Sequence, residues 1–358
     1  MLRANQYLLE IENYKPGKAK ISGAQKAVKL SSNENALGCS PKAIAAYQEH
    51  AAEISRYADG GCGLLREALA KKNNIDAEKI ICGAGSDEII AMLTAAFAKE
   101  GDEIIYSEHG FLMYPISAKR VGALSVKVKE KDLKIDVAAI LQAITPKTKI
   151  IFIANPNNPT GSYLSKDEMA RLIAGVPKNI LIVLDHAYQE FAQHLADDYP
   201  DGIKLVDENE NVIMLRTFSK VYGLASLRIG WAYGSLYIAD VLNKVRGPFN
   251  VGGPAQAAAV AALEDEEFFQ KSLAHNKKWL EEISASLAAS GKIKVWPSVA
   301  NFILLDFGGE EKCQAANKML LANNIIVREM QAYGLPQCLR ITIGTEEENK
   351  KLIEVLKK

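Results

Sequence analysis

The sequence predicts an α/β protein, with a doubly wound, mainly parallel sheet in a large domain and a second, smaller α/β domain. Short β-branched runs alternate with helical patterns through the middle of the chain, and this alternation is typical of a parallel sheet with helices on both faces. After residues 246–254 the composition shifts to a long Ala-rich stretch. The chain of 358 residues also has the length of about two domains, at roughly 150 residues each.

Each strand expected in the large domain is a short run of mostly apolar, often β-branched residues. These runs are residues 79–82, 103–107, 124–128, 149–154, 180–185, 212–217 and 228–233. The expected helices lie between the strands, where apolar residues recur every three to four positions. They are residues 86–99, 113–121, 137–144, 165–174 and 236–245.

The C-terminal part resembles a smaller α+β unit that begins with the Ala-rich, helix-favouring stretch. Its expected strands are residues 294–295, 301–307, 325–328 and 339–343, with a helix near 311–323 and a final helix at the C-terminus. The first 35 residues contain several Lys and show no strong period, so we expect an arm that extends across the molecule. We therefore place the large domain at residues 36–250, and the small domain at residues 251–358 together with the arm of residues 1–35.

Composition excludes several classes of partner. Forty-three basic and 43 acidic residues leave no formal net charge, so no overall field draws the chain to nucleic acid or to an anionic membrane. The apolar runs are far shorter than the ~20 residues that span a bilayer, and the N-terminus has no apolar targeting core. The five cysteines have no CxxC spacing, which argues against a disulfide framework. We expect a cytoplasmic protein that binds neither nucleic acid nor membrane.

The histidines give no sign of a metal centre. His109 and the other four histidines lack an HExxH motif or any other close His or Cys ligand spacing, so no metal is expected.

A glycine-rich turn between the first expected strand and helix is the first candidate site. It reads Gly83-Ala84-Gly85-Ser86-Asp87-Glu88, and free N–H groups at the start of a helix bind anions. Glu88 stands where a dinucleotide-binding fingerprint needs its third glycine. The alternative is an ordinary turn with Ser86 or Asp87 as the helix N-cap.

Polar side chains also follow the next buried strands. Asn158 lies in the segment Asn155–Gly161, which contains more asparagines than a turn needs and stands at the carboxyl edge where open α/β sheets bind ligands. Asp185 closes an apolar run, with Tyr188 three residues later. A carboxylate at such a position is costly without a positive partner. A well-ordered turn and a helix N-cap are the respective alternatives.

The last candidate cluster follows the strand of residues 212–217. Thr217, Ser219 and Lys220 come at its end, and Arg228 lies eight residues beyond the lysine. Hydroxyls with an arginine suit a phosphate ester, and a lysine supplies a reactive amine. Because the candidate groups all follow carboxyl ends of strands, they can converge on one crevice.

Together these residues resemble the fold-type I pyridoxal-phosphate (PLP) aminotransferases. The resemblance rests on Asn158-Pro159-Thr160-Gly161, Asp185 with Tyr188, Ser219-Lys220 and Arg228, in the same order and at similar separations. Within that fold type, five segments are similar to the histidinol-phosphate aminotransferase family. They are residues 29–35, 56–59, 111–114, 327–330 and 338–344.

The resemblance implies a role for each residue at the reacting centre. Lys220 would form a Schiff base with PLP and then shuttle a proton. Asp185 would pair with the pyridinium nitrogen and keep it protonated. Tyr188 and Asn158 would hydrogen-bond the phenolic oxygen of the cofactor, and Phe111 would stack on its ring.

The resemblance also implies how the cofactor phosphate is held. The phosphate would be bound by the backbone of Gly85 and Ser86, by the side chains of Ser86, Thr217 and Ser219, and by Arg228. Asp87 would belong to the same cofactor-binding set. Tyr57 would reach the phosphate from a neighbouring subunit, which implies a homodimer with shared active sites.

Substrate binding is implied for four further residues. Arg340 resembles the arginine that binds the substrate α-carboxylate, and a bidentate fork suits that planar group. Arg328 would be a second cation for a substrate phosphate, with an ordinary ion pair as the alternative. Tyr14 and Asn33 would line the pocket, although Tyr14 could equally be an anchoring aromatic. Two residues depart from the family pattern. His186 stands where the family usually has Glu, and Ala58 stands where it often has Pro.

The implied reaction is a ping-pong transfer of an amino group between L-histidinol phosphate and 2-oxoglutarate or glutamate. A broad-specificity aromatic amino acid aminotransferase on the same scaffold is the nearest alternative. A decarboxylase of phosphorylated amino acids would share the cofactor and is disfavoured by Arg340. A non-catalytic binding protein would be expected to lose Lys220.

Overall fold

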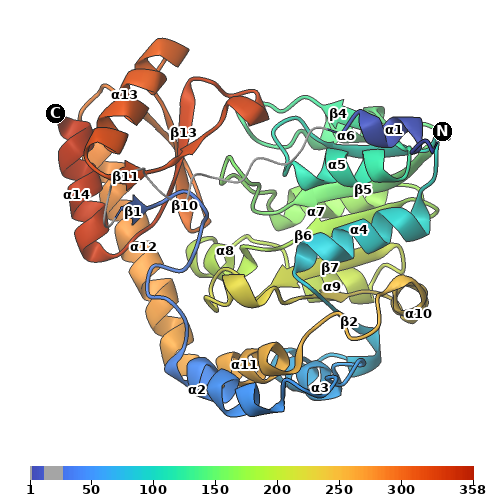
Figure 1. Cartoon of the computed structure of the whole chain (residues 1–358). Helices are drawn as coiled ribbons and strands as arrows, with labels where there is room; N and C mark the ends of the chain where they lie inside the picture. The colour runs from blue at the N-terminus through green and yellow to red at the C-terminus, as the bar shows by residue number, and fades with distance from the viewer. Residues whose placement is uncertain (1, 12–26) are drawn as a thin grey trace.

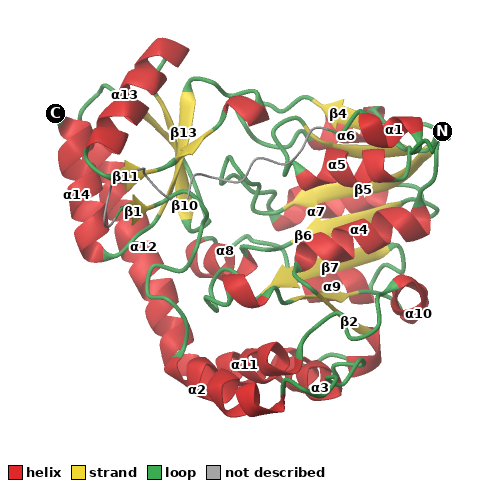
Figure 2. Ribbon diagram, in the orientation of Figure 1, coloured by secondary structure: helices red, strands yellow, loops and turns green. Residues whose placement is uncertain are grey.

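A seven-stranded sheet forms the centre of the larger part of the molecule (Figures 1 and 2). The computed structural model describes residues 2–11 and 27–358. The sheet order is β2-β8-β7-β6-β5-β3-β4. The strands are β2 Ile80–Gly83, β3 Glu103–Ser107, β4 Leu124–Val128, β5 Thr148–Ala154, β6 Leu181–Asp185, β7 Val212–Thr217 and β8 Gly230–Tyr233. Only β8 runs antiparallel to its neighbours, so the predicted mainly parallel sheet is confirmed.

Helices cover both faces of this sheet because its central strands are apolar on both sides. In β5, Ile150 and Phe152 belong to one core while Ile151 and Ile153 belong to the other. The first core is covered by α4 Ser86–Phe97, α5 Met113–Arg120 and α10 Leu236–Val245. The second is covered by α3 Gly63–Asn73, α6 Val137–Gln142, α7 Lys166–Gly175, α8 Gln189–Leu195, α9 Gly202–Asp207 and α11 Gly253–Glu264.

The smaller unit is built around an antiparallel sheet of order β12-β13-β10-β9. Its strands are β9 Lys294–Trp296, β10 Phe302–Asp306, β12 Arg328–Glu329 and β13 Cys338–Thr342. A separate parallel pair joins β1 Val28–Lys29 to β11 Ile325–Ile326. The helices α12 Glu266–Ala288, α13 Glu310–Ala322 and α14 Glu346–Lys357 cover these strands, with Trp279 and Ile283 in the core.

The N-terminal segment touches both units. Helix α1, Gln6–Leu9, packs beside α5 on the larger unit, whereas β1 pairs with β11 in the smaller one (Figure 1). Helix α2, Pro41–His50, packs against α11. The division of the chain at residue 250 remains a proposal. Helix α11 follows that position and packs with α2 and α3, so the long helix α12 makes the connection to the smaller unit.

Two expected strands differ from those observed. The run 325–328 is split into β11 and β12, and its two halves pair in different sheets. The run expected at 228–233 begins only at Gly230, because Arg228 has a φ of +55°, which interrupts extended backbone. Short 3-10 turns complete the described elements. They are η1 Ala51–Glu53, η2 Ala77–Lys79, η3 Ala225–Leu227 and η4 Gln331–Tyr333.

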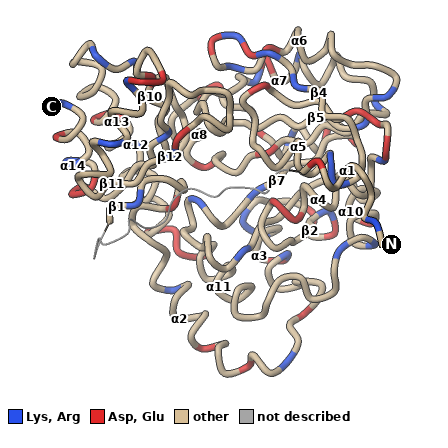
Figure 3. Tube along the Cα trace, turned by 45° about the horizontal axis from the view of Figure 1, so that its top comes forward, with Lys and Arg blue, Asp and Glu red and all other residues tan. Residues whose placement is uncertain are grey.

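Charges of both signs are scattered over both units (Figure 3), in keeping with the neutral composition. Over residues 2–11 and 27–358, no helix has the length and apolar character needed to cross a bilayer. The same residues contain no cluster of three or more His, Cys, Asp or Glu side chains that could hold a metal ion.

Candidate active site

A cavity of about 410 Å³ lies between the carboxyl ends of β5, β6 and β7 and the strands β12 and β13 of the smaller unit. Most of the residues predicted from the sequence meet there. Those lining it are Asn33, Ser86, Asp87, Phe111, Asn158, Asp185, Tyr188, Thr217, Ser219, Lys220, Arg228, Arg328 and Arg340. Gly85 lies directly behind this lining, beside Arg228. Tyr57 lies outside the cavity at the surface, and Tyr14 lies outside the described residues.

One end of the cavity is an anion cradle at the start of α4. Gly85 has a φ of +83°, and a Cβ at this position would lie 2.4 Å from Arg228 Nη2. Only glycine therefore allows the guanidinium to approach the backbone this closely. The N-cap is Gly85 and makes no side-chain cap, so the alternative with Ser86 or Asp87 as N-cap is wrong. Uncapped N–H groups and the helix dipole favour an anion at this end.

Hydroxyl groups complete the cradle from the end of β7. The Thr217 hydroxyl donates to Ser219 Oγ at 3.0 Å, and Arg228 Nη1 donates to the same Ser219 oxygen at 3.3 Å. Arg228 Nη2 also lies 3.4 Å from the Asp87 carboxylate. This half-exposed carboxylate orients the guanidinium of Arg228. The cradle still has more hydrogen-bond donors than acceptors, which suits an anion.

Asp185 occupies the middle of the cavity at the end of β6. Side chains alternate along a strand, and Asp185 therefore shares the face of Val183, which packs toward α4 and α5. Its Oδ2 accepts a hydrogen bond from the Tyr114 hydroxyl at 2.8 Å. Burial raises the pKa of Asp185 to about 6, against the opposing effect of the Tyr114 hydrogen bond. Asp185 is not the N-cap of the next helix, because Tyr188 takes that position.

Lys220 lines the same cavity as Asp185. Its Nζ donates to the Ser32 carbonyl at 3.3 Å and lies 5.5 Å from the centre of the Tyr188 ring. Burial and, next, the positive charge of Arg340 lower the pKa of Lys220 to about 8. A much larger fraction of this amine is therefore neutral near physiological pH than for a solvated lysine, which suits a nucleophile.

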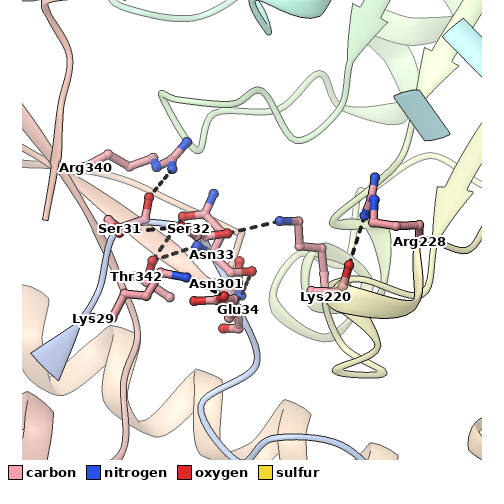
Figure 4. Close-up of polar contacts among 11 residues, drawn as sticks. Lys29, Ser31, Ser32, Asn33, Glu34, Lys220, Arg228, Asn301, Arg340 and Thr342 are labelled. Carbon is pink, nitrogen blue, oxygen red and sulfur yellow. Dashed lines mark hydrogen bonds and ion pairs between the residues drawn. The ribbon is translucent and has the colours of Figure 1, made fainter. Parts of the chain in front are cut away.

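The smaller unit contributes two arginines at the other end. Arg340 on β13 and Arg328 on β12 are directly opposite one another in the antiparallel register. Arg340 Nη1 donates to Asn158 Oδ1. Its Nη2 donates to the Ser31 carbonyl at 2.9 Å (Figure 4). Its Nε is buried without a hydrogen-bond partner among the described residues, so the guanidinium retains donor capacity for a ligand.

The sequence reasoning missed several residues of the cavity. Tyr114 lies in the segment 111–114 that resembles the family, but the sequence did not indicate its hydrogen bond to Asp185. Glu34 and Tyr333 also line the cavity, as do Ser31 and Ser32. Tyr114 stands three residues after Phe111, a spacing that puts both on one side of a helical turn and could have pointed to it.

Comparisons with known proteins define the class. A sequence model of the family described as aminotransferase class I and II matches residues 25–356. The chain belongs to this family, and the resemblance found from the motifs is confirmed.

Within the family, several similar proteins are histidinol-phosphate aminotransferases. The histidinol-phosphate aminotransferase of Paramagnetospirillum magneticum is 50% identical over 352 residues, which cover 98% of this chain and 96% of that protein. That of Maricaulis maris is 46% identical over 351 residues, with 98% and 96% covered. The crystal structure of histidinol-phosphate aminotransferase from Sinorhizobium meliloti in complex with pyridoxal-5'-phosphate superposes with a TM-score of 0.91 at 26% identity, covering 99% of this chain and 98% of that one.

The residues of the cavity fit this cofactor. The cradle at Gly85 has no room for a Cβ but offers uncapped N–H groups and a cation for a phosphate. Asp185 and Lys220, a buried carboxylate and a buried amine, lie between the cradle and the arginine pair. The cavity therefore offers a site for the phosphate, a carboxylate for the pyridine nitrogen and an amine for the aldehyde of PLP.

Proposed function

We propose that this chain is a PLP-dependent aminotransferase that moves an amino group between L-histidinol phosphate and 2-oxoglutarate in a ping-pong reaction. The observation that carries the substrate assignment is the pair of opposed arginines, Arg328 and Arg340, at the end of the cavity away from the cradle. The cavity thus offers two anion sites, and one is left for the substrate when the cofactor phosphate occupies the other.

When bound, PLP supplies an electron sink for the electrons released at the substrate α-carbon. We assign its phosphate to Ser86, Thr217, Ser219 and Arg228, with the backbone of Gly85. Asp87 keeps the Arg228 guanidinium oriented in this set. Phe111 covers one face of the ring.

The residues at the reacting centre hold or move protons. Asp185 keeps a proton on the ring nitrogen, and Tyr114 fixes the direction of that carboxylate. Tyr188 and Asn158 hydrogen-bond the phenolic oxygen. Lys220 holds the cofactor and then carries the proton at its Nζ, for which a lowered pKa is an advantage.

The arginine pair explains how one pocket accepts two kinds of anion. Histidinol phosphate carries a CH2–O–phosphate group where an amino acid has its α-carboxylate. Arg340 satisfies a carboxylate with two parallel hydrogen bonds, but a phosphate has a third acceptor oxygen and about twice the charge. Arg328, across the strand pair, supplies the second cation.

We also propose a homodimer in the cytoplasm. Ile54, Tyr57 and Leu64 are strongly exposed, with Tyr57 at 85%, and Tyr57 stacks on Phe249 with ring centres 4.6 Å apart. Such an apolar surface is typical of a protein interface, and Tyr57 is then presented to the partner's cofactor phosphate. The five cysteines are free thiols, which suits a reducing compartment.

A half-reaction screen tests the substrate assignment. Cofactor-loaded protein is mixed separately with histidinol phosphate, glutamate, phenylalanine and tyrosine, and the visible absorption is followed. Histidinol phosphate and glutamate should react fastest. A protein that ignores histidinol phosphate but reacts with phenylalanine would be an aromatic amino acid aminotransferase instead.

Variants of the arginine pair test the phosphate site. Arg328→Ala should lower kcat/KM for histidinol phosphate by a factor of roughly 30 to 1,000, about 2–4 kcal/mol, and should affect phenylalanine clearly less. Arg340→Ala should damage every substrate. Equal losses on both substrates in Arg328→Ala would contradict its role in phosphate binding.

A further inference from the structure

Asn33 joins the two units at the wall of the cavity. Its side chain is 1% exposed, and its backbone has a φ of +54°, a left-handed conformation that asparagine tolerates better than most residues. The backbone N–H donates to Thr342 Oγ1 at 2.9 Å, and the carbonyl accepts from Asn301 Nδ2 at 3.1 Å. Figure 4 shows this residue between the arginine strand and Lys220. The turn is therefore fixed on both sides by the smaller unit.

The hydrogen bonds also fix which way the Asn33 amide points. Thr342 Oγ1 accepts the Asn33 N–H, so its own proton is free to go to Asn33 Oδ1, 3.2 Å away. In the structure the amide oxygen faces Thr342 and accepts that proton, which an NH2 group could not do. The amide nitrogen is left facing Tyr188, whose hydroxyl oxygen lies 2.9 Å from Asn33 Nδ2.

This orientation decides where the Tyr188 hydroxyl proton goes. Since Nδ2 can only donate, Tyr188 accepts from Asn33 and must direct its own O–H elsewhere. In the described part of the chain, no acceptor for that proton is within hydrogen-bond distance, so the O–H is free to donate to a bound molecule. The charged groups that act on this hydroxyl are Arg340, Asp185 and Asp87.

The same contacts tie Tyr188 to the substrate-binding strand. Thr342 lies two residues after Arg340 on β13, so both side chains are on one face of that strand. Arg340 holds the Ser31 carbonyl and Thr342 holds Asn33. The turn of residues 31–33 therefore keeps a fixed distance between the arginine and the tyrosine.

We infer that Asn33 is a positioning residue that turns the Tyr188 hydroxyl proton toward the phenolic oxygen of the cofactor and holds Tyr188 in register with Arg340. The inference rests on the proposed function, because it needs PLP in the cavity. Asn33 acts through Tyr188 and the backbone and makes no contact with the reacting atoms. This role differs from the one expected from the sequence, in which Asn33 contacts the substrate directly.

The test replaces the amide without forbidding the left-handed backbone. Asn33→Gly keeps that conformation accessible and removes the bond to Tyr188. Asn74→Gly is the matched control, because Asn74 has nearly the same φ of +53° and caps α3 away from the cavity. Asn33→Ser, too short to reach Tyr188, is a second variant should the glycine fold poorly.

The readout is the pH titration of the visible absorption of the loaded proteins, together with their affinity for PLP. A hydrogen bond from Tyr188 stabilises an anionic phenolic oxygen, so its loss should raise the apparent pKa of the bound chromophore by about one unit, a tenfold change. Asn33→Gly and Asn33→Ser should show this rise, and Asn74→Gly should titrate like the wild type.

A double-mutant cycle separates the proposed role from a general structural disturbance. Tyr188→Phe should raise the apparent pKa by itself, and Asn33→Gly in that background should add less than about 0.3 unit, because its effect passes through the missing hydroxyl. Additive shifts, or an unchanged pKa in Asn33→Gly, would overturn the inference. A wild-type protein that does not load PLP would instead overturn the proposed function.

Discussion

His186, directly after Asp185, shows how burial determines the charge of a single side chain. Its ring is fully buried, with Nδ1 2.8 Å from Gln189 Oε1 and the ring centre 5.7 Å from that of Tyr199. Burial, assisted by the positive charge of Arg216, lowers the pKa of His186 to about 3. A neutral imidazole with its proton on Nδ1 satisfies Gln189. His186, which follows Asp185 directly, therefore stays uncharged at neutral pH.

We predict that His186 makes the cofactor-free protein sensitive to acid. Its pKa is about 6.5 in an unfolded chain and lower in the folded one, so the unfolded state binds the proton first as pH falls. Stability present above pH 6.5 is then lost as pH falls toward 3, by about 2 kcal/mol at pH 5. His186→Gln should remove most of this difference in urea unfolding at pH 7.5 and pH 5. The same loss in wild type and variant would contradict the prediction.

At the residue scale, the sequence pointed to polar side chains that follow the end of a strand. It did not point to side chains whose importance depends on a hydrogen bond to a residue far away in the sequence. Asp185 and Lys220 were found because a charged residue at or just past the end of an apolar run is unusual. The Tyr114 bond to Asp185 spans 71 positions, and the Asn33 bond to Tyr188 spans 155. Such pairings depend on tertiary structure, which local patterns do not contain. The roles of the site residues themselves remain proposals.

At the scale of elements, Glu130 connects two loops that line the cavity. It lies just after β4, and its Oε1 accepts from the Ser107 hydroxyl, from the His109 N–H at 3.3 Å and from Asn157 Nδ2 at 3.3 Å. The first loop leads to Phe111 and the second contains Asn158. Burial raises the pKa of Glu130, although its hydrogen bonds oppose this. One carboxylate thus positions both loops from behind.

We predict that removing this carboxylate weakens the cofactor site without touching it. Glu130→Ala removes the acceptor of three hydrogen bonds and loosens both loops, so PLP affinity should fall by about tenfold, the equivalent of one or two hydrogen bonds. Glu130→Gln keeps an acceptor and should lose less. Fluorescence titration of the cofactor-free proteins measures this. Glu108→Ala, at a half-buried neighbour, is the control, and a similar effect there would show that the loss is not specific to Glu130.

For the elements that it predicted, apolar periodicity placed most bounds within one or two residues, because a strand or helix must bury its apolar side. The same pattern was misleading where one continuous apolar run is divided between strands of two different sheets. Residues 325–327 form an apolar run that is followed by Arg328, but the chain leaves the β1–β11 pair after Ile326 and enters the larger sheet of the smaller unit at Arg328. The change places Arg328 opposite Arg340. The pattern could not show this change of sheet, since both halves are equally extended.

At the scale of the whole molecule, one residue expected at the cofactor phosphate lies apart from the others. Tyr57, expected from the family resemblance to bind the phosphate, is exposed and held at the surface by its stacking on Phe249. It does not line the cavity of its own chain. From this position Tyr57 could reach the site of a neighbouring chain, and we therefore propose that each active site is built from two chains.

Hybrid dimers test this arrangement. A Tyr57→Phe chain is refolded together with a Lys220→Ala chain, and exchange is verified by a tag on one of them. In a hybrid, the site that uses the intact Lys220 of the first chain also receives the intact Tyr57 of the second, while the other site has both lesions.

With random pairing, half of the dimers are hybrids with one intact site each, so about a quarter of wild-type activity should return. The Lys220→Ala homodimer should be inactive and the Tyr57→Phe homodimer should be impaired by about tenfold through the lost phosphate hydrogen bond. If verified hybrids show no activity beyond that of the separate homodimers, then each site is built from one chain and Tyr57 has only a surface role.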